Sequence, residues 1–102
     1  MMLNRFFQLV LSVSLIFAAA NFAQEMKPEA GKLFNEGNSL LKAGNYNGAV
    51  DKYNQALAIE KDYRIYYQKG VALKKADKLE GARIAFEECL KLSPNNEAAL
   101  NA

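Results

Sequence analysis

The chain repeats part of its own sequence. Gly37 recurs as Gly70. Small and aromatic residues around Gly37 recur around Gly70 with the same separation along the sequence, which we call the repeat period. The other corresponding pairs are Leu40 with Leu73, Tyr46 with Leu79, Ala49 with Ala82, Tyr53 with Phe86, Ala56 with Cys89 and Leu57 with Leu90. Internal repetition with a period of about 20 to 50 residues is typical of stacked supersecondary units that share one continuous core. We therefore predict a short helical array, for which the functional question is what its surface binds.

Apolar residues within each period recur every three or four positions, which is the spacing of one face of an α-helix. This pattern predicts helices from Glu29 to a stop at Gly44, over 46–59, from 63 to near Ala76, over 79–92 and over 97–100. Gly44 suits a left-handed stop, and Asn45 and Asp77 suit the N-caps of the second and fourth helices. Asn95 or Asn96 is expected to begin the fifth segment.

The short turns between these helices predict how the helices pack. Turns of two to three residues make consecutive helices fold back as antiparallel hairpins. Gly37 and Ala49 fall where the helices of the first hairpin cross, since larger side chains there would hold the backbones apart. Tyr53 and Phe86 are expected to fill the spaces beside the small residues. The predicted fold is all-α, with two antiparallel hairpins stacked as a short α-solenoid and a short C-terminal helical segment.

The first 23 residues have a different character from the rest of the chain. A short start with one positive charge is followed by the apolar run Phe6–Phe17 and then by small residues. This order is that of a signal peptide, so we expect cleavage after Ala20 or Ala23 and a periplasmic or secreted protein, with 24–29 as a linker. The alternatives are a retained membrane anchor or a buried core helix. The apolar run is about a dozen residues long, shorter than the roughly 20 that span a bilayer.

The composition argues against catalysis. Histidine is absent, which removes the commonest metal ligand and the usual general base near neutral pH. Glu87 and Glu88 are adjacent, so a helix directs them about 100° apart rather than toward one substrate. We expect no enzyme activity, no metal and no cofactor. A net charge of +2 gives no reason to expect nucleic acid or an anionic membrane surface as a partner.

The repeated residues resemble the tetratricopeptide repeat. We expect the first repeat at 30–62 and the second at 63–96, with 97–102 as a truncated third repeat or capping segment. The matching positions are Leu33, Gly37, Leu40, Ala49, Tyr53 and Ala56 in the first repeat, and Tyr66, Gly70, Leu73, Ala82, Phe86, Cys89 and Pro94 in the second. The chain departs from the family pattern at Lys61, where the first repeat would carry a proline. Its repeat period is also slightly shorter than the usual one of about 34 residues.

This resemblance implies a non-catalytic protein-interaction module. In the family, the first helix of each repeat lines a concave face that holds an extended peptide or a partner's helix. The residues expected on that face are Phe34, Asn38, Leu41, Lys42, Arg64, Tyr67, Val71, Lys74 and Lys75. They would form an apolar strip with a basic edge that attracts an acidic segment or a free carboxylate. The alternative is that the lysines are only solvated and that Phe34 and Tyr67 serve packing.

One known function of the family is a two-carboxylate clamp that grips the acidic C-terminal tails of heat-shock chaperones. The clamp needs a lysine shortly before the first glycine, where this chain has Phe34, and an asparagine after it, which Asn38 matches. Gln68 stands at the clamp asparagine of the second repeat, and the third repeat that supplies further cations is interrupted. We therefore do not expect this clamp.

A two-repeat array has a single inter-repeat interface, whereas about three repeats are normally needed for stability. We therefore expect the face around Ile84, Cys89, Leu92 and Leu100 to stay partly exposed and to be covered by a second copy or a larger partner. Cys89 is either a small buried residue in an alanine position or an exposed thiol that forms an intermolecular disulfide. The alternative function is an anchored scaffold or oligomerisation module that retains the N-terminal segment.

Overall fold

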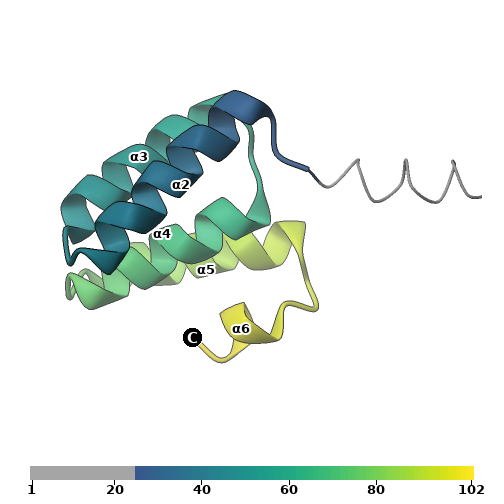
Figure 1. The fold of residues 1–102 in the computed structure, drawn as a ribbon. Coiled ribbons are helices and arrows are strands. Elements are labelled where there is room, and N and C mark those ends of the chain that lie inside the picture. The colour runs from purple at the N-terminus through teal and green to yellow at the C-terminus, as the bar shows by residue number, and fades with distance from the viewer. Residues whose placement is uncertain (1–24) are drawn as a thin grey trace, which may run out of the picture.

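The computed structural model of the protein describes residues 25–102, which form five helices and contain no strand. The helices are α2 (Pro28–Lys42), α3 (Tyr46–Ile59), α4 (Tyr63–Lys75), α5 (Leu79–Leu92) and α6 (Glu97–Leu100) (Figure 1). The all-α prediction is confirmed, and the helices begin and end close to their expected positions. The expected signal peptide at 1–23 lies outside the described residues. Among residues 25–102, no helix has the length and apolar character needed to cross a membrane.

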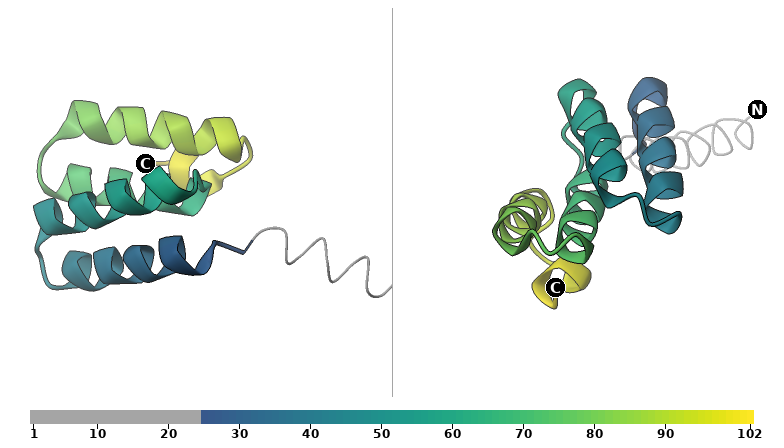
Figure 2. Two further views of the ribbon diagram at one scale, coloured as in Figure 1. Left: turned by 90° about the horizontal axis from the view of Figure 1, so that it is seen from above. Right: turned by 90° about the vertical axis from the view of Figure 1, so that its left-hand side faces the viewer.

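Consecutive helices pack side by side, so the fold is a stack of two helical hairpins. Helices α2 and α3 form the first hairpin, and α4 and α5 form the second. The two hairpins meet mainly where α3 packs on α4, and α6 packs on α5 at the far end of the stack. Figure 2 shows the same order, and its right-hand view places α6 beyond the second hairpin.

The residues at the helix ends explain why the first hairpin turns where it does. Pro28 occupies the first turn of α2, where a missing N–H is no loss. Gly44 has a φ of 82°, which favours glycine and ends α2. Asn45 then caps α3, because its Oδ1 accepts a hydrogen bond of 3.0 Å from the Gly48 N–H. Asn96 caps α6 in the same way, accepting from the Ala99 N–H at 3.1 Å. These predicted stops and caps are confirmed.

The start of α5 differs from its prediction. Asp77 does not cap this helix; the N-cap residue is Lys78, which makes no side-chain capping bond. Asp77 instead has a φ of 61°, the left-handed conformation that Gly44 adopts one repeat period earlier. The prediction was wrong because the second turn repeats the backbone of the first. The capping position of the second turn therefore corresponds to Asn45 of the first turn, and it is occupied by Lys78.

The prediction that large residues fill the space beside small ones is confirmed. Tyr53 is fully buried between α2 and α3, and a Cβ added at Gly37 would lie 2.5 Å from its Cε1 atom. In the second hairpin, a Cβ at Gly70 would lie 2.6 Å from Cε1 of Phe86. Real Cβ atoms do not approach other atoms so closely. Both aromatic rings therefore lie directly against the backbone of the facing helix.

The first core joins the two hairpins. It contains five fully buried residues of α3 and α4, namely Ala49, Tyr53, Ala56, Ile65 and Ala72. The second core lies between α4, α5 and α6 and contains Leu73, Ala82, Ala85, Phe86, Cys89 and Ala99. The one buried residue of α6, Ala99, therefore ties this short helix to the stack.

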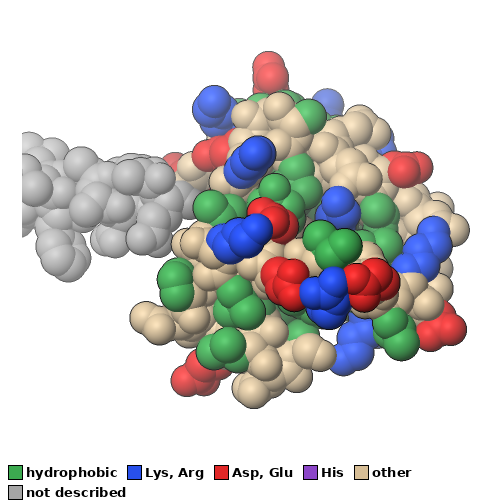
Figure 3. Space-filling view, turned by 180° about the vertical axis from the view of Figure 1, so that it is seen from behind, with side chains coloured by type: hydrophobic (Ala, Val, Ile, Leu, Met, Phe, Trp, Pro, Cys, Tyr) green, Lys and Arg blue, Asp and Glu red, His purple; other side chains and the backbone are tan. Residues whose placement is uncertain are grey.

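The end of the stack formed by α5 and α6 keeps large apolar residues in solvent. Leu79, Ile84, Leu92 and Leu100 are 49–60% exposed. Of the two alternatives for Cys89, the structure shows the small buried residue in an alanine position rather than the exposed thiol. Its side chain is fully buried in the second core because it occupies an alanine position that faces inward. Seen from behind, hydrophobic side chains lie among acidic and basic ones on the molecular surface (Figure 3).

Candidate functional site

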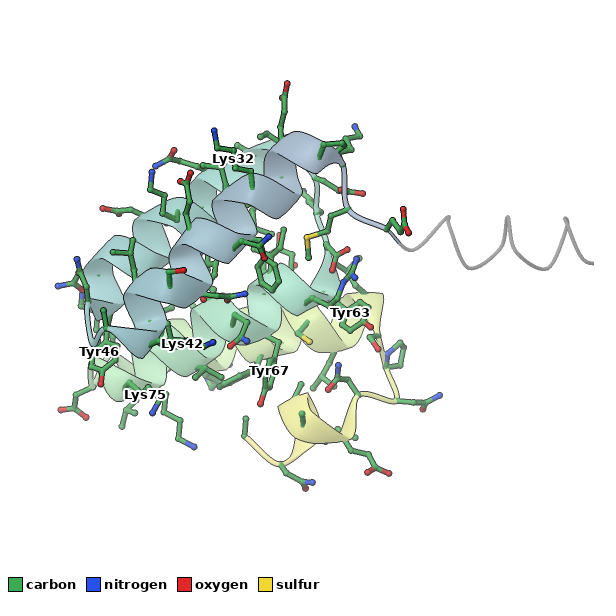
Figure 4. The ribbon with its side chains drawn as sticks, in the orientation of Figure 1. Lys32, Lys42, Tyr46, Tyr63, Tyr67 and Lys75 are labelled. Carbon is green, nitrogen blue, oxygen red and sulfur yellow. The ribbon has the colours of Figure 1, made fainter. Side chains whose placement is uncertain are left out.

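Four of the residues predicted to bind a partner lie around one cavity. Tyr67, Val71, Lys74 and Lys75 of α4 line a cavity of about 410 Å³. Phe86 of α5 contributes to the same cavity, and Ala98, Asn101 and Ala102 form its opposite wall. Figure 4 shows Tyr67 pointing from α4 toward α6. The cavity therefore combines apolar surface, an aromatic ring and two primary amines.

Two aromatic rings give the cavity a fixed shape. The centroid of the Tyr67 ring lies 5.8 Å from that of Phe86, with the ring planes tilted by 53°. Tilted pairs at this separation attract each other through the quadrupoles of the rings. Phe86 packs directly against the backbone at Gly70, so the half-buried Tyr67 ring contacts a ring that is itself fixed in position. A rigid aromatic side chain can offer contact area without losing much conformational entropy on binding.

The predicted residues of the first repeat serve both the core and the surface. The ring of Phe34 lies 5.9 Å from that of Tyr53, and Phe34 and Leu41 both pack on the first core. Neither is fully buried, so each still presents part of its side chain to solvent. The expectation that Phe34 and Tyr67 are partly packing residues is consistent with these contacts.

Asn38 makes a specific contact that the sequence analysis missed. The hydroxyl of Tyr53 donates a hydrogen bond of 2.6 Å to Oδ1 of Asn38. Burial raises the pKa of Tyr53 to about 12, so the hydroxyl keeps its proton at neutral pH. The sequence does carry an indication of this contact. Asn38 and Tyr53 of the first repeat correspond to Val71 and Phe86 of the second, so both polar groups are absent together.

Arg64 does not line the cavity, and neither do the predicted residues of α2, which are Phe34, Asn38, Leu41 and Lys42. The Arg64 guanidinium donates to both oxygens of Asp62, at 2.9 Å and 2.7 Å, and lies 5.9 Å from the centre of the Tyr63 ring. Burial alone would raise the pKa of the Asp62 carboxyl, but hydrogen bonds from the Arg64 side chain and backbone, with the Arg64 charge, lower it. Arg64 thus stabilises the N-cap of α4.

The basic residues of the predicted edge lie at the ends of two helices. Lys42 is in the last turn of α2, and Lys74 and Lys75 are in the last turn of α4. Figure 4 shows Lys42 and Lys75 at the same end of the molecule. Lysines at these positions stabilise their own helices through the helix dipole, and their exposed amines also remain accessible to a partner. Lys74 Nζ lies 3.4 Å from the backbone oxygen of Ala102.

The role of α6 as a cavity wall was the other feature that the sequence did not predict. Ala98, Asn101 and Ala102 face the predicted residues of α4 across the cavity. The segment was expected as a truncated third repeat or a capping segment, and it packs on α5 of the second hairpin. Because it is only four residues long, its position depends on the burial of Ala99 rather than on a repeated helical pattern.

The described residues offer little for catalysis. Residues 25–102 contain no cluster of three or more acidic or cysteine side chains arranged to hold a metal ion. Burial, followed by the negative charge of Asp62, raises the pKa of the Cys89 thiol. A thiol is a nucleophile only as the thiolate, so Cys89 is poorly suited to that role.

Comparisons with known proteins agree with this architecture. Models of the tetratricopeptide repeat match residues 30–63 and 63–96. Sperm-associated antigen 1 of Mus musculus is 35% identical over 68 residues, which is 66% of this chain and 8% of that protein. A small glutamine-rich tetratricopeptide repeat-containing protein of Dictyostelium discoideum is 34% identical over 74 residues, 72% of this chain and 22% of that protein. The chain thus corresponds to a small part of each relative.

The two model matches adjoin and together extend over about two thirds of the chain. They coincide with the two hairpins, since the junction at residue 63 is the first residue of α4. Such repeats generally serve as non-catalytic scaffolds that bind other proteins, which identifies these hairpins as a protein-interaction module. The chain belongs to the tetratricopeptide repeat family.

Proposed function

We propose that this protein is exported and binds an extended peptide or a partner's helix through the face formed by α2 and α4. We call this face the groove, and define it by Phe34, Asn38, Leu41, Lys42, Tyr67, Val71, Lys74 and Lys75. The observation that carries the proposal is the cavity that Tyr67, Val71, Lys74 and Lys75 share. We propose no catalytic activity.

The chemistry of the groove favours a partner that combines apolar side chains with acidic ones. Tyr67 and Phe34 offer half-buried rings, each supported by a second ring beneath it. Lys42, Lys74 and Lys75 add three exposed positive charges at one end. Charges at the rim of an interface mainly increase the rate of association and the selectivity, whereas buried aromatic residues contribute most of the affinity.

Selection from a displayed library of linear peptides tests this proposal, with the full-length chain as the target. We expect the selected peptides to be acidic and apolar, and to lose at least about tenfold in affinity on Tyr67→Ala. Lys74→Glu should weaken binding mainly through slower association, and this effect should shrink at high salt. Lys32→Glu is the matched control, because Lys32 is exposed on α2 and projects away from Tyr67 (Figure 4).

Unchanged binding by both Tyr67→Ala and Lys74→Glu would place the partner elsewhere and contradict the proposal. Circular dichroism should confirm that each variant keeps its helical content. An equal loss with Lys32→Glu would indicate that only the net charge of the protein matters.

Export is proposed from the pattern of residues 1–23 and needs a test of its own. Expression in a bacterial host followed by N-terminal sequencing should give a mature protein that starts at Asn21 or Gln24. A product that retains Met1 and stays with the membrane fraction would favour the anchored alternative.

An oligomerisation module is the second candidate, and the exposed end of the stack favours it. Ala82, Phe86 and Leu90 of α5 correspond to Ala49, Tyr53 and Leu57 of α3, which α4 covers in the first core. On α5, Ala99 of α6 covers part of the corresponding face, and a cavity of about 350 Å³ remains beside Leu79, which is 60% exposed. Sedimentation should then show self-association that Leu79→Lys weakens. A stable monomer across micromolar concentrations would contradict this candidate.

A further inference from the structure

The outer side of α5 carries a narrow stripe of residues at helical spacing. Leu79, Arg83, Glu87 and Leu90 follow one another at intervals of three or four residues, so they lie along one face of the helix. We call these four residues the end stripe. They all line the cavity of about 350 Å³ at the α5 end of the stack. Leu90 is half-buried, whereas the side chains of Arg83 and Glu87 are 54% and 53% exposed, so the end stripe is accessible from solvent.

The corresponding side of α3 packs on α4 in the first core. One repeat period before the end stripe, the four positions hold Tyr46, Val50, Asn54 and Leu57. The middle of the stripe has therefore changed from a valine and an asparagine to the ion pair of Arg83 and Glu87. An apolar helix packed over this pair in the way that α4 covers α3 would desolvate both charges, which is costly. The end stripe thus favours an occupant that carries charges of its own.

A second copy of α5 has the charges that the end stripe requires. If Arg83 lies opposite Glu87 of a second, antiparallel α5, two-fold symmetry repeats the same contact with the copies exchanged. This register also places Leu79 beside Leu90 of the second copy at both ends of the contact. Arg83 already bonds to Glu80 and Glu87 of its own chain, and its guanidinium has five N–H donors, so it can bridge carboxylates of both copies. One register therefore matches the apolar ends and the charged middle together.

The opposite end of the stack is not suited to the end stripe. On α4, Ile65 and Ala72 are fully buried in the core shared with α3. One repeat period earlier, α2 has Lys32 and Ser39, which are both exposed. A lysine in the place of Ile65 would lose hydration without gaining apolar contacts. Head-to-tail stacking of α2 on α5, which would give open filaments, is therefore disfavoured, whereas contact between two α5 ends closes after two copies.

We propose that the end stripe is the contact surface of a symmetric dimer, in which two α5 helices pack antiparallel and Arg83 of each copy pairs with Glu87 of the other. This inference rests on the oligomerisation candidate and deepens it by naming the partner and the pairing. It does not depend on peptide binding in the groove. Among residues 25–102, the exposed large apolar residues all lie on α5 or α6, and a dimer through this end would cover part of that surface.

Charge exchange tests the pairing, with sedimentation equilibrium of the full-length chain at low salt as the measurement. Arg83→Glu places like charges at both symmetric contacts, and Glu87→Arg does the same. Each should weaken self-association at least about tenfold. The double variant restores opposite charges and should associate within about threefold of the wild type. Mixing the two single variants should also restore association, because each contact of the mixed dimer again joins opposite charges.

Lys32→Glu and Glu29→Arg are the matched controls, because they change the net charge by the same amounts at exposed positions of α2 and should leave self-association unchanged. Circular dichroism should show that every variant keeps its helical content. Unchanged self-association of both single variants, or no recovery on mixing them, would overturn the inference. If the wild type still associates in that case, the oligomerisation candidate survives. A wild type that stays monomeric across micromolar concentrations would remove both, without bearing on the groove.

A second readout locates the contact in the wild type. On dilution of the ¹⁵N-labelled full-length chain, the backbone signals of the end stripe should shift as the dimer dissociates, while those of Lys32 and Ser39 on α2 should stay unchanged. Signals that shift on α2 as well as on α5 would indicate head-to-tail stacking and would contradict the symmetric dimer.

Discussion

At the scale of single residues, two glycines of α2 have different roles. A Cβ at Gly37 would lie 2.5 Å from a ring atom of Tyr53, which is fully buried and has no space to move. A Cβ at Gly31 would have only Met26 within reach, at 4.0 Å. Gly37 is therefore needed for the close approach of α2 and α3, whereas Gly31 only raises the conformational entropy of the unfolded chain.

Substituting these glycines should change stability in opposite directions. Gly37→Ala forces the Tyr53 ring out of place, and overpacking of this kind costs about 1–3 kcal/mol. The gain in helix propensity returns less than about 1 kcal/mol, so we expect a net loss. Gly31→Ala should stabilise the protein by a few tenths of a kcal/mol, up to about 1 kcal/mol. Urea denaturation of both variants would show this, and a stable Gly37→Ala protein would contradict the packing of the first hairpin.

The Asp62 carboxyl should make stability depend on pH in the acid range. Its pKa is lowered in the folded state by Arg64, so the stabilisation is present above the unfolded pKa of about 3.9 and is lost as pH falls through the folded value. Asp62→Asn keeps a capping oxygen but has no charge. We expect this variant to be about 0.5–1 kcal/mol less stable at pH 7, because Arg64 is partly exposed.

The same comparison at low pH provides the control for Asp62. The wild type and Asp62→Asn should converge in free energy of unfolding as pH falls from about 4 toward 2, since the wild-type carboxyl then becomes neutral too. Other carboxyl groups titrate in both proteins and cancel in the difference. A gap that stays constant over this range would show that the ion pair with Arg64 does not stabilise the fold.

At the scale of elements, the two hairpins differ most at the start of their second helices. Asn45 caps α3 through Gly48, whereas Lys78 begins α5 without a side-chain cap. The residue that corresponds to Gly48 is Gly81, so the backbone needed for a cap is already in place. Lys78→Asn should therefore supply the missing bond.

We expect Lys78→Asn to raise the free energy of unfolding by about 0.5–1 kcal/mol. The substitution removes a hydrogen bond from Lys78 to Asn47, but that bond is exposed and contributes little. The reverse change, Asn45→Lys, should destabilise the first hairpin by a similar amount. Thermal denaturation followed by circular dichroism would measure both. A destabilised Lys78→Asn protein would show that the two turns are not equivalent.

The helices themselves could be predicted from the sequence because local signals determine them. The three- and four-residue spacing defines each apolar face, and Gly44, Asn45 and Asn96 stop or cap helices through bonds to near neighbours. Asp77 was assigned the wrong role because both a cap and a left-handed turn suit aspartate. The correspondence with Gly44 across one repeat period was the information that decides between them.

The groove could be predicted only in outline. The family pattern indicated which residues of α2 and α4 to consider, and four of those on α4 share a cavity. Repetition gave no information about α6, because this wall of the cavity depends on a short segment held by Ala99. The bond from Tyr53 to Asn38 depends on how closely two helices approach, which the spacing of residues along the chain does not specify.

At the scale of the whole molecule, the stack is small and its two ends are different. One fully buried cluster, which includes Ile65 and Ala72 of α4, joins the hairpins. The α5 end exposes Leu79 and Leu92, so it offers an apolar surface that competes with the groove as a place for a partner. The groove and the α5 end therefore predict different contacts for a bound peptide.

The most direct measurement is a titration of the ¹⁵N-labelled full-length chain with the peptide selected from the library, followed by two-dimensional NMR. We predict that the shifted signals belong to the groove, including Asn38, Tyr67, Val71 and Lys74, while those of the exposed α5 face stay unchanged. Shifts confined to Leu79, Ile84 and Leu92, with the groove unaffected, would contradict binding in the groove.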